Sequence, residues 1–292
     1  MRVRAAVGAA GLSVAVRALS TLAASDRAPD AGGDATRLLR AAAAPTVLYS
    51  SWFCPYAQRA WIALEEKAVP YRYVEITPYE AAPWSGYTKK ALSLEEKARR
   101  YPAFVKASAR GLVPAIAHGA AALHDSMVCL EWVEEQWPHT APLLPGTPAQ
   151  RAHLRQWAVY ASERIIPFYY KMLMAVDDPA RQHAKETALS GLSQFAKAMA
   201  PANEGPFFLG ADFSYVDIAV FPWVERFLTV GAAYRGFELP AAEEFDRLRV
   251  WHAACRARPS VARTLANEEE LISNYSGYAD NSATSDAAQK FR

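Results

Sequence analysis

An apolar strand that runs directly into an amphipathic helix, with a second strand after it, most restricts the fold of this chain. Thr46–Ser50 is short and apolar, as buried strands are. From Pro55 to Ala68 the apolar residues recur at three- and four-residue spacings, which predicts a helix. Tyr71–Ile76 alternates apolar and polar residues and predicts a second strand. Together they form a βαβ unit, whose strands are expected to be parallel and whose crossover is expected to be right-handed.

Cys54 stands at the junction between the first strand and the helix. At a helix N-terminus, unpaired backbone N–H groups and the positive end of the helix dipole stabilise a thiolate, the nucleophilic form of cysteine. Pro55 is favourable at the first helical position because its missing N–H would have no partner there. The alternative is a buried cysteine that only fills space. The strand–Cys-Pro–helix context favours the reactive thiol.

The remaining elements of this first domain are short. Ser93-Leu94-Glu95-Glu96 has capping-box spacing and predicts a helix within a polar stretch. A glycine turn then separates two short strands, and Asp125-Ser126 begin a helix that Pro138 ends. The two strands and the helix are expected at residues 111–117, 121–123 and 125–137. The order β-α-β-α-β-β-α over residues 45–138 predicts an α/β domain.

The second half of the chain reads as helical. Residues 139–148 are rich in proline and predict a linker, after which helical spacing predicts an all-helical domain over residues 149–272. A long helix is expected to bend at Pro167, and a capping box at Ser214–Asp217 opens an apolar core helix. The expected helices are 151–176, 185–199, 215–230 and 245–258. Residues 273–292 are expected to form a loose polar tail.

Charge and cysteine content argue against several classes of protein. The 292 residues include 32 basic and 30 acidic ones, a net charge of +2, which argues against nucleic acid or a membrane surface as a partner. No apolar run reaches about 18 residues, so no transmembrane helix is expected. Cys54, Cys129 and Cys255 are few and far apart, which predicts neither a disulfide framework nor a metal site and indicates a reducing compartment. We expect no metal and no nucleotide, because the histidines are scattered and no glycine-rich phosphate loop occurs.

Residues 1–44 differ in composition from the rest. Arg2, Arg4 and Arg17 precede the first acidic residue, Asp26, in a segment rich in small residues. This composition is typical of an organelle transit peptide, and a disordered extension is the alternative. A secretory signal is disfavoured because an arginine closely follows the apolar stretch. The expected location is cytoplasmic, or mitochondrial or plastid if the segment is a transit peptide.

Four segments together resemble a known family. They are Cys54-Pro55-Tyr56-Ala57-Gln58-Arg59, Gly111-Leu112-Val113-Pro114, Asp125-Ser126 and Phe221-Pro222-Trp223-Val224-Glu225-Arg226. In this order the chain is similar to the cytosolic glutathione transferases, and in particular to their cysteine-type omega and lambda classes. The resemblance implies a thioredoxin-like α/β domain followed by an all-α domain, glutathione as co-substrate, and a two-fold symmetric homodimer.

The resemblance also implies roles around glutathione. Pro114 is expected to be cis, so that the backbone of Val113 pairs with the cysteinyl part of glutathione as an added strand would. Ser126 is expected to hold the γ-glutamyl carboxylate at a helix N-terminus, and Asp125 to accept from the γ-glutamyl ammonium. A plain N-cap is the alternative for Ser126. The other expected glutathione contacts are Phe53, Pro55, Leu112 and Arg100, the last after a segment longer than in relatives.

A wall for the second substrate is expected from Tyr56, Trp223 and Tyr169. Tyr56 lies close to the thiol in sequence, and Trp223 belongs to the apolar core helix. Ordinary core packing explains Trp223 equally well. Tyr169, with its neighbour Tyr170, is a weaker candidate of the same kind.

Ala57 stands where a resolving cysteine of the glutaredoxin type would be, so a monothiol scheme is expected. The Cys54 thiolate attacks a glutathione mixed disulfide or an acceptor such as dehydroascorbate, and a second glutathione releases it. This predicts thioltransferase and dehydroascorbate reductase activities. The alternative is conjugation of electrophiles, with Ser51 or Tyr49 holding the glutathione thiolate. A non-catalytic ligand-binding protein and a chloride-channel-like protein remain as further alternatives.

Overall fold

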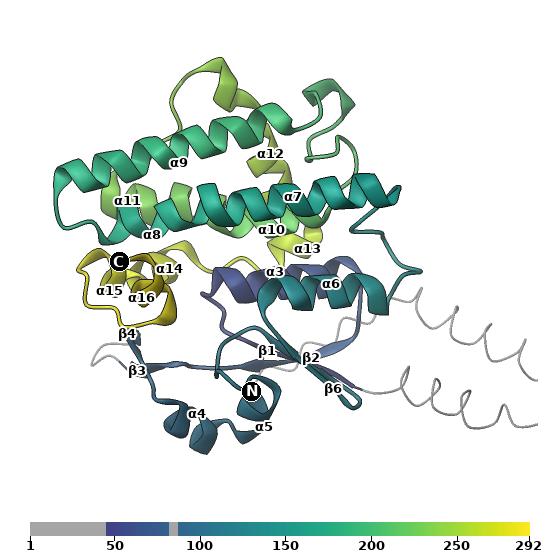
Figure 1. The fold of residues 1–292 in the computed structure, drawn as a ribbon, viewed down its shortest axis with the longest axis vertical. Helices are drawn as coiled ribbons and strands as arrows, with labels where there is room; N and C mark the ends of the chain where they lie inside the picture. Colours follow the sequence, from purple (N-terminus) through teal and green to yellow (C-terminus); the bar gives the residue numbers. More distant parts are fainter. Residues whose placement is uncertain (1–44, 82–86) are drawn as a thin grey trace, which may run out of the picture.

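The computed structural model describes residues 45–81 and 87–292. The predicted transit peptide or extension, residues 1–44, lies outside the described residues. In the described part, an α/β layer lies against a larger helical layer (Figure 1). The predicted α/β domain followed by an all-helical domain is therefore confirmed.

A four-stranded mixed sheet forms the centre of the α/β domain. The strand order is β2-β1-β5-β6, with β1 (Thr46–Ser50), β2 (Tyr71–Glu75), β5 (Ala115–His118) and β6 (Ala121–His124). β1 pairs with β2 in parallel and with β5 antiparallel. The helix α3 (Pro55–Glu66) connects β1 to β2, as the βαβ pattern predicted.

Both faces of β1 are buried, which explains why its sequence is apolar throughout. Leu48 belongs to the main core beneath α3 and α6 (Ser126–Gln136), whereas Val47 and Tyr49 pack on the opposite face with Phe104 of α5 (Pro102–Ala107). Alternate side chains of a strand point to opposite faces, so one short strand contributes to both layers. The end of β1 is thereby fixed where the chain turns into α3.

The segment between β2 and β5 contains more structure than the sequence indicated. The helix predicted at Ser93 is present as α4 (Leu94–Arg100), with the Ser93 hydroxyl accepting from the N–H of Glu96. Before it, β3 (Tyr79–Ala81) and β4 (Tyr87–Ala91) form an antiparallel hairpin that was not predicted. The strand β4 is hydrogen-bonded to a segment far along the sequence. The N–H of Thr284 donates to Lys89 O, and Thr284 Oγ1 accepts from Ala91 N. Local pattern cannot reveal such a hairpin.

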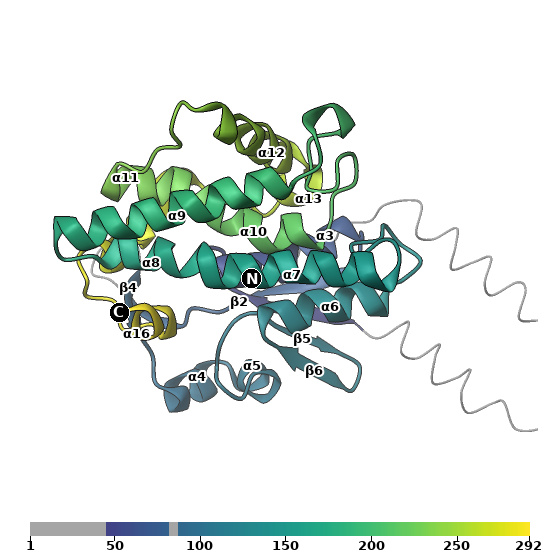
Figure 2. The same cartoon turned by 45° about the horizontal axis from the view of Figure 1, so that its top comes forward.

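The helical domain packs its longest helices around a buried central one (Figure 2). Its main helices are α7 (Pro148–Arg164), α8 (Ile166–Met174), α9 (Asp178–Ala198), α10 (Tyr215–Arg226), α12 (Asp246–Ala257) and α13 (Pro259–Ala262). The bend predicted near Pro167 is the break between α7 and α8 at Ile165. No helix of the described residues is both long and apolar enough to cross a membrane.

The central helix α10 is buried along its whole length and packs against α3. This contact joins the two domains. Asp217 in its first turn is completely buried and accepts hydrogen bonds from the N–H and hydroxyl of Ser214. Its other oxygen accepts from Trp251 Nε1 of α12 at 2.6 Å and from the N–H of Phe208 at 2.9 Å. Asp217 therefore caps α10 and also holds α12 and the segment around Phe208 against it.

The expectation of a loose tail at residues 273–292 is wrong. The chain continues from α14 (Glu268–Asn274) into the short helices α15 (Ser276–Ala279) and α16 (Asp286–Phe291), which lie beside the β3-β4 hairpin (Figure 1). Tyr275, Tyr278 and Phe291 are buried, and the Phe291 ring stacks on Tyr170 of α8. A few well-spaced aromatic and alanine side chains suffice to bury this segment, although its average composition is polar.

Candidate functional site

A cavity of about 650 Å³ lies between the α/β domain and the helical domain. Its floor is the start of α3 at Cys54, and one side is the loop before β5 together with the start of α6. The β3-β4 hairpin and the C-terminal segment close the other side. Lys97 of α4 and Tyr170 of α8 complete the lining, so the site is assembled from seven separate parts of the chain.

Cys54 occupies the N-cap of α3, with Pro55 at the first helical position as predicted. The backbone N–H groups of Ala57 and Tyr56 approach the sulfur and lower its pKa, as do the charges of Arg226 and Lys89. Burial is the larger effect, however, and raises the pKa of the Cys54 thiol above its ordinary value. The helix N-terminus lowers the pKa of the thiol, as expected, but the burial of the thiol raises it by more.

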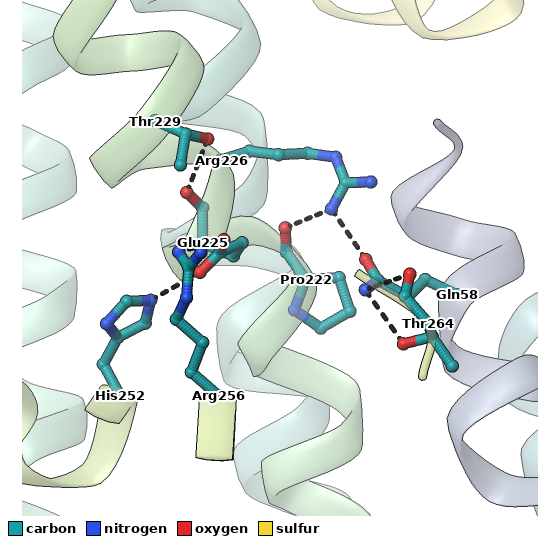
Figure 3. A network of polar contacts seen from close by, with 8 residues as sticks. All are labelled: Gln58, Pro222, Glu225, Arg226, Thr229, His252, Arg256 and Thr264. Carbon is teal, nitrogen blue, oxygen red and sulfur yellow. Dashed lines mark hydrogen bonds and ion pairs between the residues drawn. The ribbon is translucent and has the colours of Figure 1, made fainter. Parts of the chain in front are cut away.

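Arg226 of α10 ties the Cys54 loop to the rest of the molecule. Its Nη2 donates to Phe53 O at 2.9 Å, its Nε donates to Tyr275 Oη at 3.1 Å, and its Nη1 donates to Gln58 Oε1 at 2.8 Å. Figure 3 shows the guanidinium bridging α10 and α3, where its Nη1 also donates to Pro222 O. One buried cation therefore holds the residue before Cys54, the helix after it and the C-terminal segment.

The neighbouring residue, Glu225, anchors α10 on its other side. It accepts from Arg256 Nη1 and lies 2.7 Å from His252 Nε2, both on α12 (Figure 3). Glu225 and Arg226 thus fix opposite sides of the same turn of α10. The segment that carried part of the family resemblance has a structural role behind the site.

Replacing Arg226 by methionine is expected to lower the free energy of unfolding by about 3 kcal/mol, because it removes four buried hydrogen bonds from a charged group. Urea denaturation followed by circular dichroism measures the change. Arg256→Met, in the same network but with a side chain 42% exposed, is the control and should cost at most about 1 kcal/mol. Equal losses in the two variants would contradict the role given to Arg226.

The loop before β5 presents free backbone groups to the cavity. The peptide bond between Val113 and Pro114 is cis, as the resemblance implied. Leu112 is held by Ser108, whose hydroxyl exchanges hydrogen bonds with its N–H and C=O. Among the described residues, the Val113 N–H and C=O have no hydrogen-bond partner. They remain available to an extended ligand.

The start of α6 is capped by Asp125 and not by Ser126. Asp125 is the N-cap, and its carboxylate accepts from the N–H groups of Met127 and Val128. Ser126 is the first helical residue, and its hydroxyl accepts from Arg59 Nη1 at 3.1 Å. The plain N-cap reading of Ser126 is therefore wrong. Both side chains line the cavity at a helix N-terminus, a favourable position for an anion.

The structure brings eight of the proposed site residues to the cavity, namely Phe53, Cys54, Pro55, Tyr56, Leu112, Val113, Asp125 and Ser126. It does not bring Arg100 there, since this side chain pairs with Glu96 on the exposed side of α4. Pro114 is buried beside the cavity without lining it.

Two of the three residues expected to form the wall for the second substrate, Trp223 and Tyr169, lie in the protein core instead. Trp223 is completely buried, with the Arg59 guanidinium 4.2 Å from its ring and Tyr56 packed edge-on. Tyr169 is completely buried against Phe227. One residue along a helix rotates a side chain by about 100°, so Tyr170 lines the cavity and Tyr169 does not.

Several cavity residues were not identified from the sequence. They are Tyr79, Lys89, Lys97, Arg110, Tyr275 and Tyr278, with further polar residues of the C-terminal segment. Lys97 lies one turn before Arg100, so a shift of one turn in the α4 alignment would have found it. Tyr275 and Tyr278 are three residues apart, a spacing that places two side chains on one face of a helix and could have indicated them. Within the described residues, no cluster of three metal-binding side chains occurs.

Comparison with known proteins supports the resemblance to the glutathione transferases. Residues 53–136 match the glutathione S-transferase N-terminal domain family and residues 178–254 match the corresponding C-terminal domain family. Glutathione S-transferase U26 of Arabidopsis thaliana is 26% identical over 226 residues, which is 77% of this chain and 91% of that protein.

Solved structures agree with these sequence matches. The crystal structure of glutathione transferase Omega 3C from Trametes versicolor is 34% identical with a TM-score of 0.67, covering 82% of this chain and 92% of that one. Rice GST1, solved in complex with glutathione, shares the fold at 22% identity and a TM-score of 0.63, covering 82% of this chain and 97% of that one. The fold, the cavity and these matches show that the chain belongs to the glutathione S-transferase family.

Proposed function

We propose that this protein is a glutathione-dependent thioltransferase and dehydroascorbate reductase that works through Cys54. The observation that carries the proposal is the position of Cys54, at the N-cap of α3 and open to the cavity. Cys129 and Cys255 are completely buried, so neither can reach it as a resolving thiol. This combination favours a monothiol scheme.

In this scheme, glutathione lies along the loop before β5. The free N–H and C=O of Val113 pair with its cysteinyl backbone, and Ser126 and Asp125 hold its γ-glutamyl end at the start of α6. Lys97 and Arg110 line the cavity and can attract its glycyl carboxylate, in place of Arg100. The aromatic side chains opposite leave an apolar space for the second substrate.

The chemistry is a pair of thiol–disulfide exchanges. The Cys54 thiolate attacks the glutathionyl sulfur of a mixed disulfide, forms a Cys54–glutathione disulfide and releases the other thiol as thiolate. A second glutathione thiolate then attacks that bond, regenerates Cys54 and leaves as glutathione disulfide. With dehydroascorbate, two glutathione molecules supply the two electrons and two protons that give ascorbate.

Conjugation of electrophiles is the second candidate, because the Arabidopsis relative is a transferase of the U series. Conjugation needs a hydroxyl that stabilises the glutathione thiolate. Ser51 is buried and donates to Ile76 O, and Tyr49 packs against Phe104 on the other face of the sheet. Neither lines the cavity, which supports disulfide chemistry as the main activity. The omega-like class and a homodimer remain part of this proposal.

Intact-protein mass spectrometry after exposure to glutathione disulfide tests the scheme. The wild-type protein should gain one glutathionyl group, which reduced glutathione removes. Cys54→Ser should gain none, whereas the control Cys129→Ser should behave as the wild type. A wild-type protein that stays unmodified would remove the basis of the proposal.

A further inference from the structure

Lys89 of β4 places its terminal nitrogen, Nζ, inside a cage of aromatic rings at the cavity. Its Nζ lies 3.5 Å from the centroid of Phe53, the residue that directly precedes Cys54. Tyr79, Tyr275 and Tyr278 follow at 4.8, 4.9 and 6.0 Å. The residue is only 1% exposed, and what remains accessible lines the same cavity as the thiol. The cage therefore holds the terminal nitrogen of Lys89 next to the start of α3.

The backbone at Lys89 is in an unfavourable conformation. Its φ of 57° lies in the left-handed region, which a residue with a Cβ rarely adopts. The hydrogen bond from the N–H of Thr284 to Lys89 O helps to hold it there. An unfavourable backbone that the surrounding structure maintains commonly marks a functional position.

The terminal nitrogen of Lys89 has no acidic partner among the described residues. Among the residues that the structure describes, no carboxylate lies within ion-pair distance of Nζ and no acceptor is hydrogen-bonded to it. Cation–π contacts offset only part of the cost of burying an unpaired charge. Burial accordingly lowers the pKa of Lys89 well below its ordinary value, and the negative charge of an ionised Cys54 acts against this. The two residues are therefore electrostatically coupled.

We propose that Lys89 accepts the proton of Cys54 and then serves as counter-ion of its thiolate. The S–H bond of Cys54 breaks, the proton passes to the lone pair of Nζ, and a thiolate–ammonium pair replaces a neutral thiol and amine. No other reactant is needed. The aromatic cage stabilises the ammonium form and holds it at the cavity that contains the reacting sulfur. The inference deepens the proposed function, because it names the group that activates its nucleophile.

The other titratable groups around this pair are unsuited to the role. Burial raises the pKa of Tyr56, Tyr79, Tyr275 and Tyr278, so their hydroxyls remain neutral. Arg226 stays charged, because its interactions with the nearby tyrosines outweigh burial and raise its pKa. It is also bound by four acceptors. Among the described groups that act on the Cys54 thiol, Lys89 is therefore the one that can gain a proton as Cys54 loses one.

The test is the rate of Cys54 alkylation by iodoacetamide as a function of pH, without glutathione, with Cys54→Ser giving the background. Lys89→Met keeps an apolar side chain in the cage but removes the proton acceptor. We expect it to slow alkylation near neutral pH at least tenfold, equivalent to about one unit of thiol pKa. Lys90→Met, at the exposed neighbouring position, should match the wild type.

Lys89→Arg separates loss of charge from loss of packing, because it puts a permanent cation in the cage. Its alkylation should be faster near neutral pH than that of Lys89→Met, and it decides the question if the methionine variant does not fold. A pH profile of Lys89→Met that overlays the wild type, or an arginine variant as slow as the methionine variant, overturns the proposal. Because glutathione is absent, failure of the proposed function would leave this result unaffected.

Discussion

Replacing Cys54 by serine or alanine is expected to lower glutathione-dependent reduction of hydroxyethyl disulfide and of dehydroascorbate by at least about 100-fold. A hydroxyl or methyl group at the N-cap of α3 cannot form the mixed disulfide on which both reactions depend. The cavity and its other side chains remain, so binding of glutathione should change little. Initial rates at saturating glutathione, with the two variants beside the wild type, measure the effect.

Cys255→Ser is the matched control for this experiment. Cys255 is completely buried in α12, and burial raises the pKa of its thiol well above the ordinary value. It should therefore take no part in exchange, and its variant should keep wild-type rates. Activity that survives in both Cys54 variants would assign the chemistry to another group.

The largest effect on stability is expected from Asp217→Ala, which should lower the free energy of unfolding by about 3–5 kcal/mol. The change leaves four buried donors without acceptors, from Ser214, Phe208 and Trp251. Burial raises the pKa of Asp217, while these hydrogen bonds lower it. Chemical denaturation at neutral pH measures the loss.

Asp246→Ala provides the comparison at the start of α12. Its side chain is 68% exposed and pairs with Arg249 on the same helix, so the loss should stay below about 1 kcal/mol. If Asp217→Ala were no more costly than Asp246→Ala, the buried capping network would not hold the helical domain together as described.

Sequence patterns predicted the parts of the fold that depend on local regularity. The strand Thr46–Ser50 and the helix opened at Ser214 are apolar runs, as elements buried on all sides require, and the helix after Pro55 has apolar residues at helical spacing. The cis bond before Pro114 and the cavity position of Ser126 followed from the family resemblance rather than from periodicity.

The parts of the fold and of the site that the sequence did not predict depend on contacts between distant segments. The β3-β4 hairpin and the helices after Tyr275 bury one another, so neither has a recognisable pattern alone. The caged Lys89 belongs to this contact and could not be recognised in a strand too short to show alternation. The burial that raises the pKa of Cys54 could not be predicted for the same reason, because the C-terminal segment that lines this cavity was expected to be loose.

The most direct test of the account compares two reactions in one preparation of the wild-type protein. The rate of glutathione-dependent hydroxyethyl disulfide reduction is measured beside the rate of glutathione conjugation to chlorodinitrobenzene, and both are repeated with Cys54→Ser. The account predicts that reduction dominates and disappears in the variant. Dominant conjugation that Cys54→Ser leaves unchanged would contradict it.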